Sequence, residues 1–169
     1  MNIEERLRRL EDEKAILDTL YAYGHHLDYG LEDAWLDCWT EDAVLDWPGR
    51  AFMRGHAELR TGFRSHSHAP GMYHKHMVVA PMITLHGDTA TVQSMFARLD
   101  RYPEGPGIRA FGRYRDTLVR CADGKWRIKE RLPEIEGVRA QAPLGGEAFP
   151  DSPAMRQAIQ GHSSTGGPT

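Results

Sequence analysis

The second half of the chain constrains the fold most, because it is predicted to form two consecutive hairpins of long strands. From Met72 to Tyr102 the sequence is rich in Val, Ile, Thr, Met and Phe, and "HGD" at 86–88 breaks it as a hairpin turn would. The loop "PEGPG" then leads to "IRAFGRYRDTLVRC", the turn "ADGK" and "WRIKERLPEI". Four long antiparallel strands in sequence order are therefore expected.

The part before these strands is predicted to be mainly helical. Apolar residues recur at helical intervals along the first thirty residues, in one stripe formed by Ile3, Leu7, Leu10, Leu17 and Tyr21 and widened by Ile16, Leu20, Tyr23 and Leu27. A second short helix ("LEDAWLDCW"), a short strand ("AVLDW") and a third helix ("GHAELRTGF") follow. This order predicts an α+β fold, in which N-terminal helices pack on one face of a curved, mainly antiparallel sheet of at least four strands.

Residues 1–139 are expected to form one domain, and residues 140–169 a C-terminal extension. Beyond Arg139 the composition shifts to Gly, Pro, Ser and Ala. Within this extension only a short helix near 153–159 is predicted, with Ser152 as its cap and Pro153 at its first position, and the end of the chain is expected to be disordered.

Charge and hydropathy exclude several classes of function. Lys and Arg number 21 against 24 Asp and Glu, and the two signs are mixed along the chain, which argues against a nucleic-acid partner. No run approaches the roughly 20 apolar residues of a membrane span, and the charged N-terminus does not resemble a signal peptide. We therefore expect a cytoplasmic protein without a membrane partner, whose two thiols, Cys38 and Cys121, are buried and reduced.

The candidate catalytic pair is an acid at the end of the first helix and a histidine at the start of the first long strand. Strand alternation puts His74 and His76 on one face, and Asp28 can approach that face if the helix packs across it. A carboxylate that accepts the Nδ1 proton of His76 leaves its Nε2 as a base. The ordinary alternative is that Asp28 only caps the following turn or is solvated.

Tyr23 is the candidate hydrogen-bond donor of this site. It precedes Asp28 by five residues, about 140° around an ideal helix. Both side chains can therefore face one cavity only if the helix loosens near Gly24 or the cavity wraps around its end. A core tyrosine with a hydroxyl at the surface is an equally good interpretation.

A metal site is the alternative use of the histidines. His66, His68, His74 and His76 lie within eleven residues, and an HxH pair on a strand can hold zinc or iron. The first pair lies in an expected loop, and Met, Pro and Gly surround the cluster, so no metal is predicted. Motifs for serine hydrolysis, nucleotide hydrolysis and dinucleotide binding are also missing, which leaves acid–base chemistry without a cofactor.

Further residues are candidates for lining a substrate pocket. The aromatic residues supply large apolar area, most of it ordinary core, and Arg131 lies near the end of the last strand. The other strand arginines, at positions 98, 113, 115, 120 and 127, are expected on the outer face of the sheet or in an oligomer contact. The predicted substrate contacts are Trp47, Phe111, Met95, Arg131 and His74.

Residues 3–136 resemble the SnoaL-like branch of the nuclear transport factor 2-like superfamily. The segments that carry the resemblance are "LYAYGHHLD", "EDAVLDW", "GHAELRTGF", "YHKHMVVAPMITLHGDTAT" and "DGKWRIKER", in that order. The resemblance implies a cone-shaped α+β barrel with a deep pocket. It also implies a homo-oligomer, a dimer or trimer, which binds a small molecule.

Within that superfamily the chain looks like the group of scytalone dehydratase, bile-acid 7α-dehydratase and hexachlorocyclohexane dehydrochlorinase. Asp28 and His76 fall on that group's Asp and His, and Tyr23 matches the tyrosine of the bile-acid enzyme. Trp47 stands where scytalone dehydratase has a second tyrosine, and "VQSMFARLDRY" lacks that enzyme's second histidine. The resemblance implies a cofactor-independent lyase, with an isomerase or a non-catalytic binding module as alternatives. It does not supply the substrate, but the aromatic and Met residues expected near the pocket suggest a cyclic, largely apolar one, such as a polyketide, terpenoid or steroid.

Overall fold

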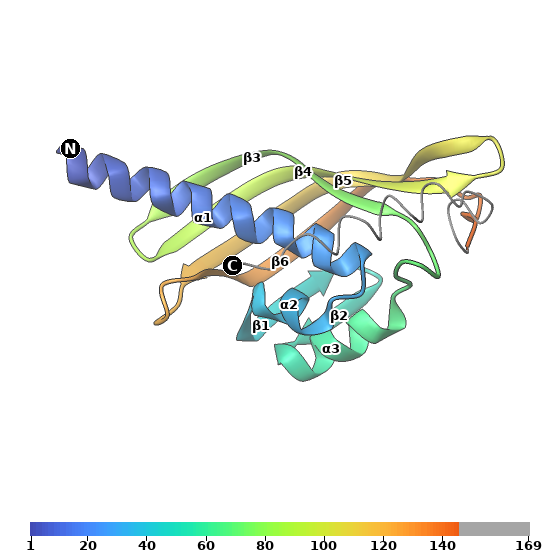
Figure 1. Ribbon diagram of the computed structural model, residues 1–169, viewed down its shortest axis with the longest axis horizontal. Helices are drawn as coiled ribbons and strands as arrows, with labels where there is room; N and C mark the ends of the chain where they lie inside the picture. Colours follow the sequence, from blue (N-terminus) through green and yellow to red (C-terminus); the bar gives the residue numbers. More distant parts are fainter. Residues whose placement is uncertain (146–169) are drawn as a thin grey trace, which may run out of the picture.

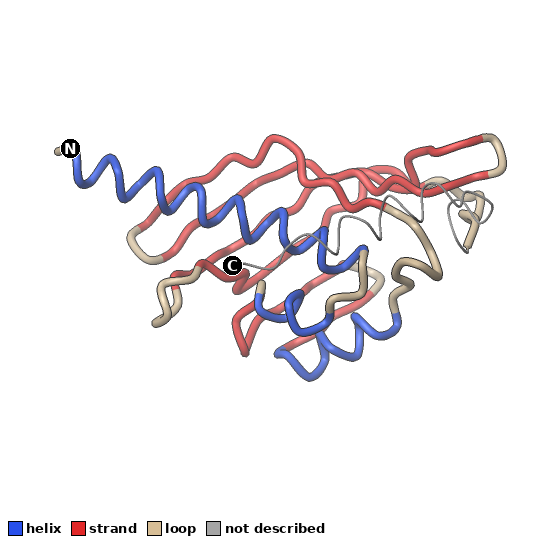
Figure 2. The backbone as a smooth tube through the Cα atoms, in the orientation of Figure 1, coloured by secondary structure: helices blue, strands red, loops and turns tan. Residues whose placement is uncertain are grey.

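The computed structural model describes residues 1–145 as a six-stranded sheet with helices along one of its faces (Figures 1 and 2). The helices are α1 (Ile3–Asp28), α2 (Glu32–Asp37) and α3 (Gly55–Ser65). The strands are β1 (Trp39–Trp47), β2 (Ala51–Arg54), β3 (Lys75–His86), β4 (Thr89–Tyr102), β5 (Gly105–Arg120) and β6 (Trp126–Val138). The helix predicted near 153–159 lies outside the described residues.

The strand order β2-β1-β6-β5-β4-β3 confirms the α+β class and the two long hairpins. Two features were not predicted: β2 pairs antiparallel with a longer β1, and β1 runs parallel to β6. The expectation of a barrel needs correction, because β2 and β3 form opposite edges of an open sheet within the described residues. The sheet curves around the helices without closing on itself (Figure 1).

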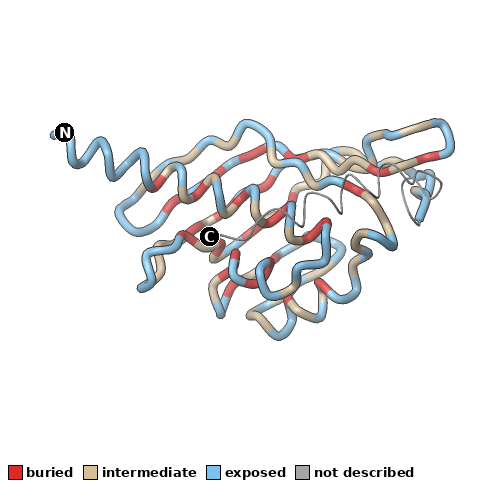
Figure 3. The backbone as a smooth tube through the Cα atoms, in the orientation of Figure 1, coloured by how far each residue is buried: buried red, intermediate tan, exposed pale blue. Residues whose placement is uncertain are grey.

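The buried face of α1 is not the stripe that the sequence suggested first. Ile16 and Leu20 are fully buried against the sheet, and Tyr23 and Leu27 continue this face. Ile3 and Leu7 are exposed, as is the whole of the chain from residue 1 to 11 (Figure 3). The helix carries two apolar stripes, and its first turns extend beyond the core, so only the second stripe meets the sheet.

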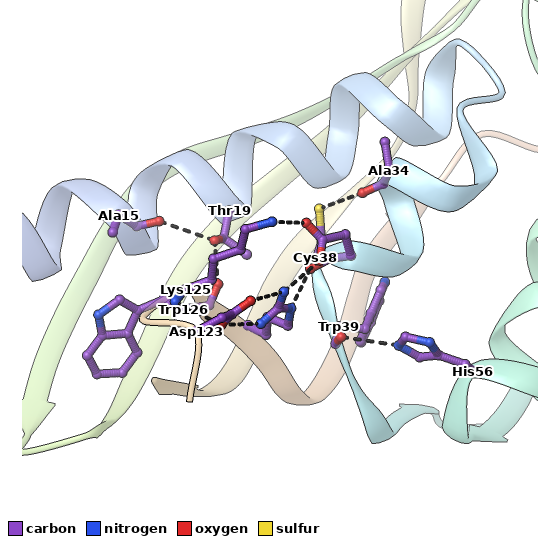
Figure 4. A network of polar contacts seen from close by, with 11 residues as sticks. Ala15, Thr19, Ala34, Cys38, Trp39, His56, Asp123, Lys125 and Trp126 are labelled. Atoms are coloured by element: carbon purple, nitrogen blue, oxygen red, sulfur yellow. Dashed lines mark hydrogen bonds and ion pairs between the residues drawn. The ribbon is translucent and has the colours of Figure 1, made fainter. Parts of the chain in front are cut away.

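Polar contacts fix the position of α1 along the sheet. Asp12 is buried and accepts hydrogen bonds from Trp126 Nε1 at 3.1 Å and Arg120 Nη2 at 2.6 Å. The Thr19 hydroxyl donates to the Trp126 carbonyl at 2.7 Å (Figure 4). Because an unpaired buried polar group is costly, these bonds oppose sliding of the helix and thereby set where Asp28 lies.

The two cysteines are free thiols in different environments. Cys38 is buried at the end of α2, and its Sγ contacts the Ala34 carbonyl at 3.5 Å (Figure 4). Burial raises the pKa of Cys38 to about 12. Cys121, beyond the end of β5, is half-buried rather than buried as expected. No helix within residues 1–145 is both long and apolar enough to cross a membrane.

Candidate active site

Asp28 and His76 are in direct contact at the junction of α1 and β3. His76 Nδ1 lies 2.6 Å from Asp28 Oδ1, and the His76 backbone N–H donates to Asp28 Oδ2 at 3.0 Å. Asp28 is 3% exposed, so its carboxylate is surrounded by protein groups and not by solvent. The buried acid therefore orients the histidine that the sequence paired with it, and leaves Nε2 of that ring available.

A close approach of backbone to backbone makes this contact possible. A Cβ atom at Gly24 would lie 2.7 Å from the His76 carbonyl oxygen, so only glycine lets α1 come this near to β3. The helix is continuous from Ile3 to Asp28 and does not loosen at Gly24, contrary to one of the two alternatives considered from the sequence. Asp28, one turn later, reaches the strand because of this close packing.

A cavity of about 230 Å³ lies between the helices and the inner face of the sheet. Tyr23 and His76 both line it, whereas Asp28 lies behind His76 and does not. Tyr23 therefore faces the cavity directly, whereas Asp28 is connected to it only through His76. Large apolar side chains from most elements complete the wall, among them Trp35, Trp47, Phe63, Phe96, Tyr114 and Ile135.

Two more histidines adjoin the pair. His74 is 2% exposed, and its Nε2 lies 3.3 Å from Asp28 Oδ1 and 3.2 Å from His66 Nε2. His66 follows the end of α3 and lines the cavity. The fourth histidine, His68, faces away: its two ring nitrogens lie 2.5 Å and 2.9 Å from the carbonyl oxygens of Leu27 and Phe63.

The surroundings hold Asp28 as a carboxylate and His66 and His74 as neutral rings. Burial alone would raise the pKa of Asp28, but the hydrogen bonds and charge of His76 outweigh it, and the pKa is lowered. Burial, together with the charge of His76, lowers the pKa of His66 to about 3 and that of His74 to about 4. Burial raises the pKa of Tyr23, so its phenol stays protonated at neutral pH and can act as a donor.

Of the five predicted substrate contacts, only Trp47 lines the cavity. Met95 and Phe111 are 53% and 48% exposed on the outer face of the sheet, which corrects the prediction. Strand alternation explains the error, because a shift of one residue moves a side chain to the other face. Phe96 and Ala110, their neighbours in sequence, line the cavity instead.

Arg131 and His74 also differ from prediction, since both are buried behind the cavity wall. The Arg131 guanidinium bonds to Asp116 at 2.8 Å and 2.7 Å, and it lies 4.2 Å from the ring centres of both Tyr23 and Tyr114. It therefore supports the two tyrosines from beneath and does not line the cavity. His74 likewise does not line the cavity, and it contacts Asp28 from behind the wall.

Three arginines that the sequence did not assign to the site line the cavity, namely Arg50, Arg98 and Arg109. Arg98 was expected on the outer face, but it is the cross-strand neighbour of His76 and donates to Asp100 at 3.0 Å. Alternation along β4 from Phe96 could have indicated its inward direction. His66 could not be found in this way, because a loop brings it to the site.

The protein is thus of the class of open α+β sheets, with an Asp–His pair at the wall of a cavity between the helices and the sheet. The particular family follows from sequence: the model of the SnoaL-like domain matches residues 8–132, and the chain belongs to this family. A search of curated protein sequences found no match.

Solved structures of the nuclear transport factor 2-like fold resemble the chain over most of its length. An NTF2-like protein with a cystatin-like fold from Novosphingobium aromaticivorans is 26% identical, with a TM-score of 0.74 over 82% of this chain and 91% of that one. A candidate scytalone dehydratase from the same organism is 20% identical, with a TM-score of 0.69 over 85% and 97%. ActVI-ORFA from Streptomyces coelicolor is 19% identical, with a TM-score of 0.66 over 73% and 96%. The last two likenesses show the fold alone.

Proposed function

We propose that the protein is a cofactor-independent lyase that eliminates water from a small cyclic, largely apolar substrate. The observation that carries this proposal is the 2.6 Å contact between Asp28 and His76 at the wall of a cavity. A histidine whose Nδ1 is held by a buried carboxylate presents Nε2 as a base, and the carboxylate stabilises the imidazolium that forms. A non-catalytic binding module would not need this pairing.

In the proposed reaction, His76 Nε2 takes a proton from a carbon beside a carbonyl group. The electron pair of the broken C–H bond forms the new double bond as a neighbouring C–O bond breaks. The imidazolium returns its proton to the departing hydroxyl, which leaves as water, and His76 is neutral again. In this mechanism Tyr23, which lines the cavity, donates a hydrogen bond to the developing oxyanion.

The cavity also favours a substrate with oxygen acceptors. None of the described residues that line it is acidic, and its polar groups include the arginines Arg50, Arg98 and Arg109. The indole N–H groups of Trp35 and Trp47 are buried and have no hydrogen-bond partner within the described residues. A ring compound that carries carbonyl, hydroxyl or carboxylate oxygens would satisfy these donors.

The test is a screen of hydroxylated cyclic carbonyl compounds, in which mass spectrometry detects products lighter by one water. Replacement of the base (His76→Ala) is expected to lower turnover by about 10² to 10⁴ while the fold is retained. The matched control is His86→Ala, an exposed histidine at the other end of β3. Full activity of the His76→Ala protein on the true substrate would end the proposal.

An isomerase is the second candidate, because moving a double bond and eliminating water both begin with removal of a proton by one base. The same contact between Asp28 and His76 supports it. The two reactions differ in the product, since an isomerised product keeps the mass of the substrate. The screen therefore decides between them without a further variant.

A further inference from the structure

We propose that His66, His74 and His76 form a binding site for a divalent transition-metal ion, with Zn²⁺ as the ion that fits best. The site shares His76 with the proposed base. The part of the inference that concerns inhibition therefore rests on the proposed function, whereas the binding itself does not.

The geometry of the three rings suits one ion. One ring nitrogen from each histidine lies within 4.8 Å of the other two. The Nε2 atoms of His66 and His74 are 3.2 Å apart. Zn–N bonds of 2.0–2.1 Å in a tetrahedral site place neighbouring ligand atoms about 3.3 Å apart, so this pair already has the required separation.

The surroundings of His74 also suit a cation. Its Nε2 lies 3.2 Å from the Nε2 of His66 and 3.3 Å from the Asp28 carboxylate. A neutral His74 has one N–H to share between them. An ion that replaces this proton would bind the lone pairs of both imidazoles, with the carboxylate nearby to balance its charge.

Asp28 occupies the position of an outer-shell partner. It holds Nδ1 of His76 at 2.6 Å, so Nε2 is the nitrogen left to coordinate an ion. Histidines that bind metals usually donate their other ring N–H to a carboxylate or carbonyl in this way, which fixes the ring and strengthens it as a ligand.

The charges around the three rings can accept a dication. The carboxylates of Asp28 and Asp100 are both buried close by, and one guanidinium, that of Arg98, is paired with Asp100 at 3.0 Å. These groups together carry one net negative charge before an ion binds. Because His66 and His76 line the cavity, a bound ion would keep a position open toward it, as in sites with three protein ligands.

Occupation of the site has a chemical consequence for the proposed reaction. A His76 nitrogen that donates its lone pair to an ion cannot take a proton from a substrate. Zn²⁺ is therefore expected to inhibit turnover, and a chelator is expected to restore it.

The experiment is a calorimetric titration of Zn²⁺ into chelator-treated full-length protein, with Co²⁺ as a visible spectroscopic probe. We expect one ion per chain. Loss of a ligand (His66→Ala) should weaken binding by more than about 100-fold, and loss of the outer-shell carboxylate (Asp28→Asn) by about 10- to 100-fold. His86→Ala, which removes an exposed histidine, is the control for adventitious binding and should change nothing.

Equal affinity of the unaltered protein and the His66→Ala protein would overturn the inference, as would loss of binding in His86→Ala. Thermal unfolding of each metal-free variant verifies that it is folded, and His66→Gln, closer in size, replaces His66→Ala if that protein is unfolded. Binding is measured without turnover. An active protein that binds no Zn²⁺ would therefore end only this inference, and an inactive protein that binds Zn²⁺ through His66 would end only the proposed function.

Discussion

Replacing Gly24 with alanine tests the close packing that brings Asp28 to His76. The added methyl group would lie 2.7 Å from the His76 carbonyl oxygen, whereas ordinary contacts begin at 3.4 Å. The gap between α1 and β3 must therefore open by about 0.7 Å, the difference of these distances. Both partners are main-chain segments, so neither can rotate out of the way as a side chain could.

Two effects of opposite sign determine the change in stability. Alanine in place of glycine within a helix stabilises by up to about 1 kcal/mol. Overpacking of a tight contact costs about 1–3 kcal/mol. The free energy of unfolding is therefore expected to fall by about 0–3 kcal/mol. A shift of the helix by about 0.7 Å would also lengthen the 2.6 Å contact between Asp28 and His76 to about 3.3 Å, beyond the usual range of a hydrogen bond.

Urea unfolding measures the stability, and a crystal structure of the Gly24→Ala protein measures the contact. The control is Gly62→Ala, the same exchange in α3, where the new methyl would meet only the flexible end of Met53. If Gly24→Ala instead raised the free energy of unfolding by about 1 kcal/mol and kept the contact at 2.6 Å, this account of Gly24 would be wrong.

Three further predictions concern groups outside the Asp–His pair. Arg131→Met leaves the buried Asp116 without its partner and should lower the free energy of unfolding in urea by about 3–5 kcal/mol. The double variant Arg131→Met with Asp116→Leu should recover much of this loss. An equal or larger loss in the double variant would contradict this prediction. Iodoacetamide at neutral pH should label Cys121 and spare Cys38 until the protein is unfolded, because burial raises the pKa of Cys38 to about 12; mass spectrometry of peptides reads the result, and early labelling of Cys38 would refute it. We also expect a dimer or trimer in sedimentation, which Phe111→Lys on the exposed outer sheet face should weaken; a mass of one chain for the unaltered protein would exclude this.

Local sequence patterns were sufficient for the architecture of the second half of the chain, and they indicated the main candidate pair without excluding that Asp28 only caps a turn or is solvated. The turns "HGD" and "ADGK" separate the predicted strands, and the observed hairpins β3–β4 and β5–β6 have these boundaries. Strand alternation put His74 and His76 on the inner face. The burial of Asp28 near the end of α1 could be anticipated because a helix must pack its apolar face on such a sheet.

The tertiary structure decided which of several equivalent local patterns faces inward. Helix α1 has two apolar stripes, and the sheet buries only the one with Ile16 and Leu20. Phe111 and Met95 fit a pocket by composition, but the register of their strands turns them outward. No local pattern predicts the parallel pairing of β1 with β6 or the contact between His66 and His74. Both depend on how the segments between the paired residues fold. Periodicity determines the type of an element and its two faces, whereas contacts between elements depend on how the whole chain packs.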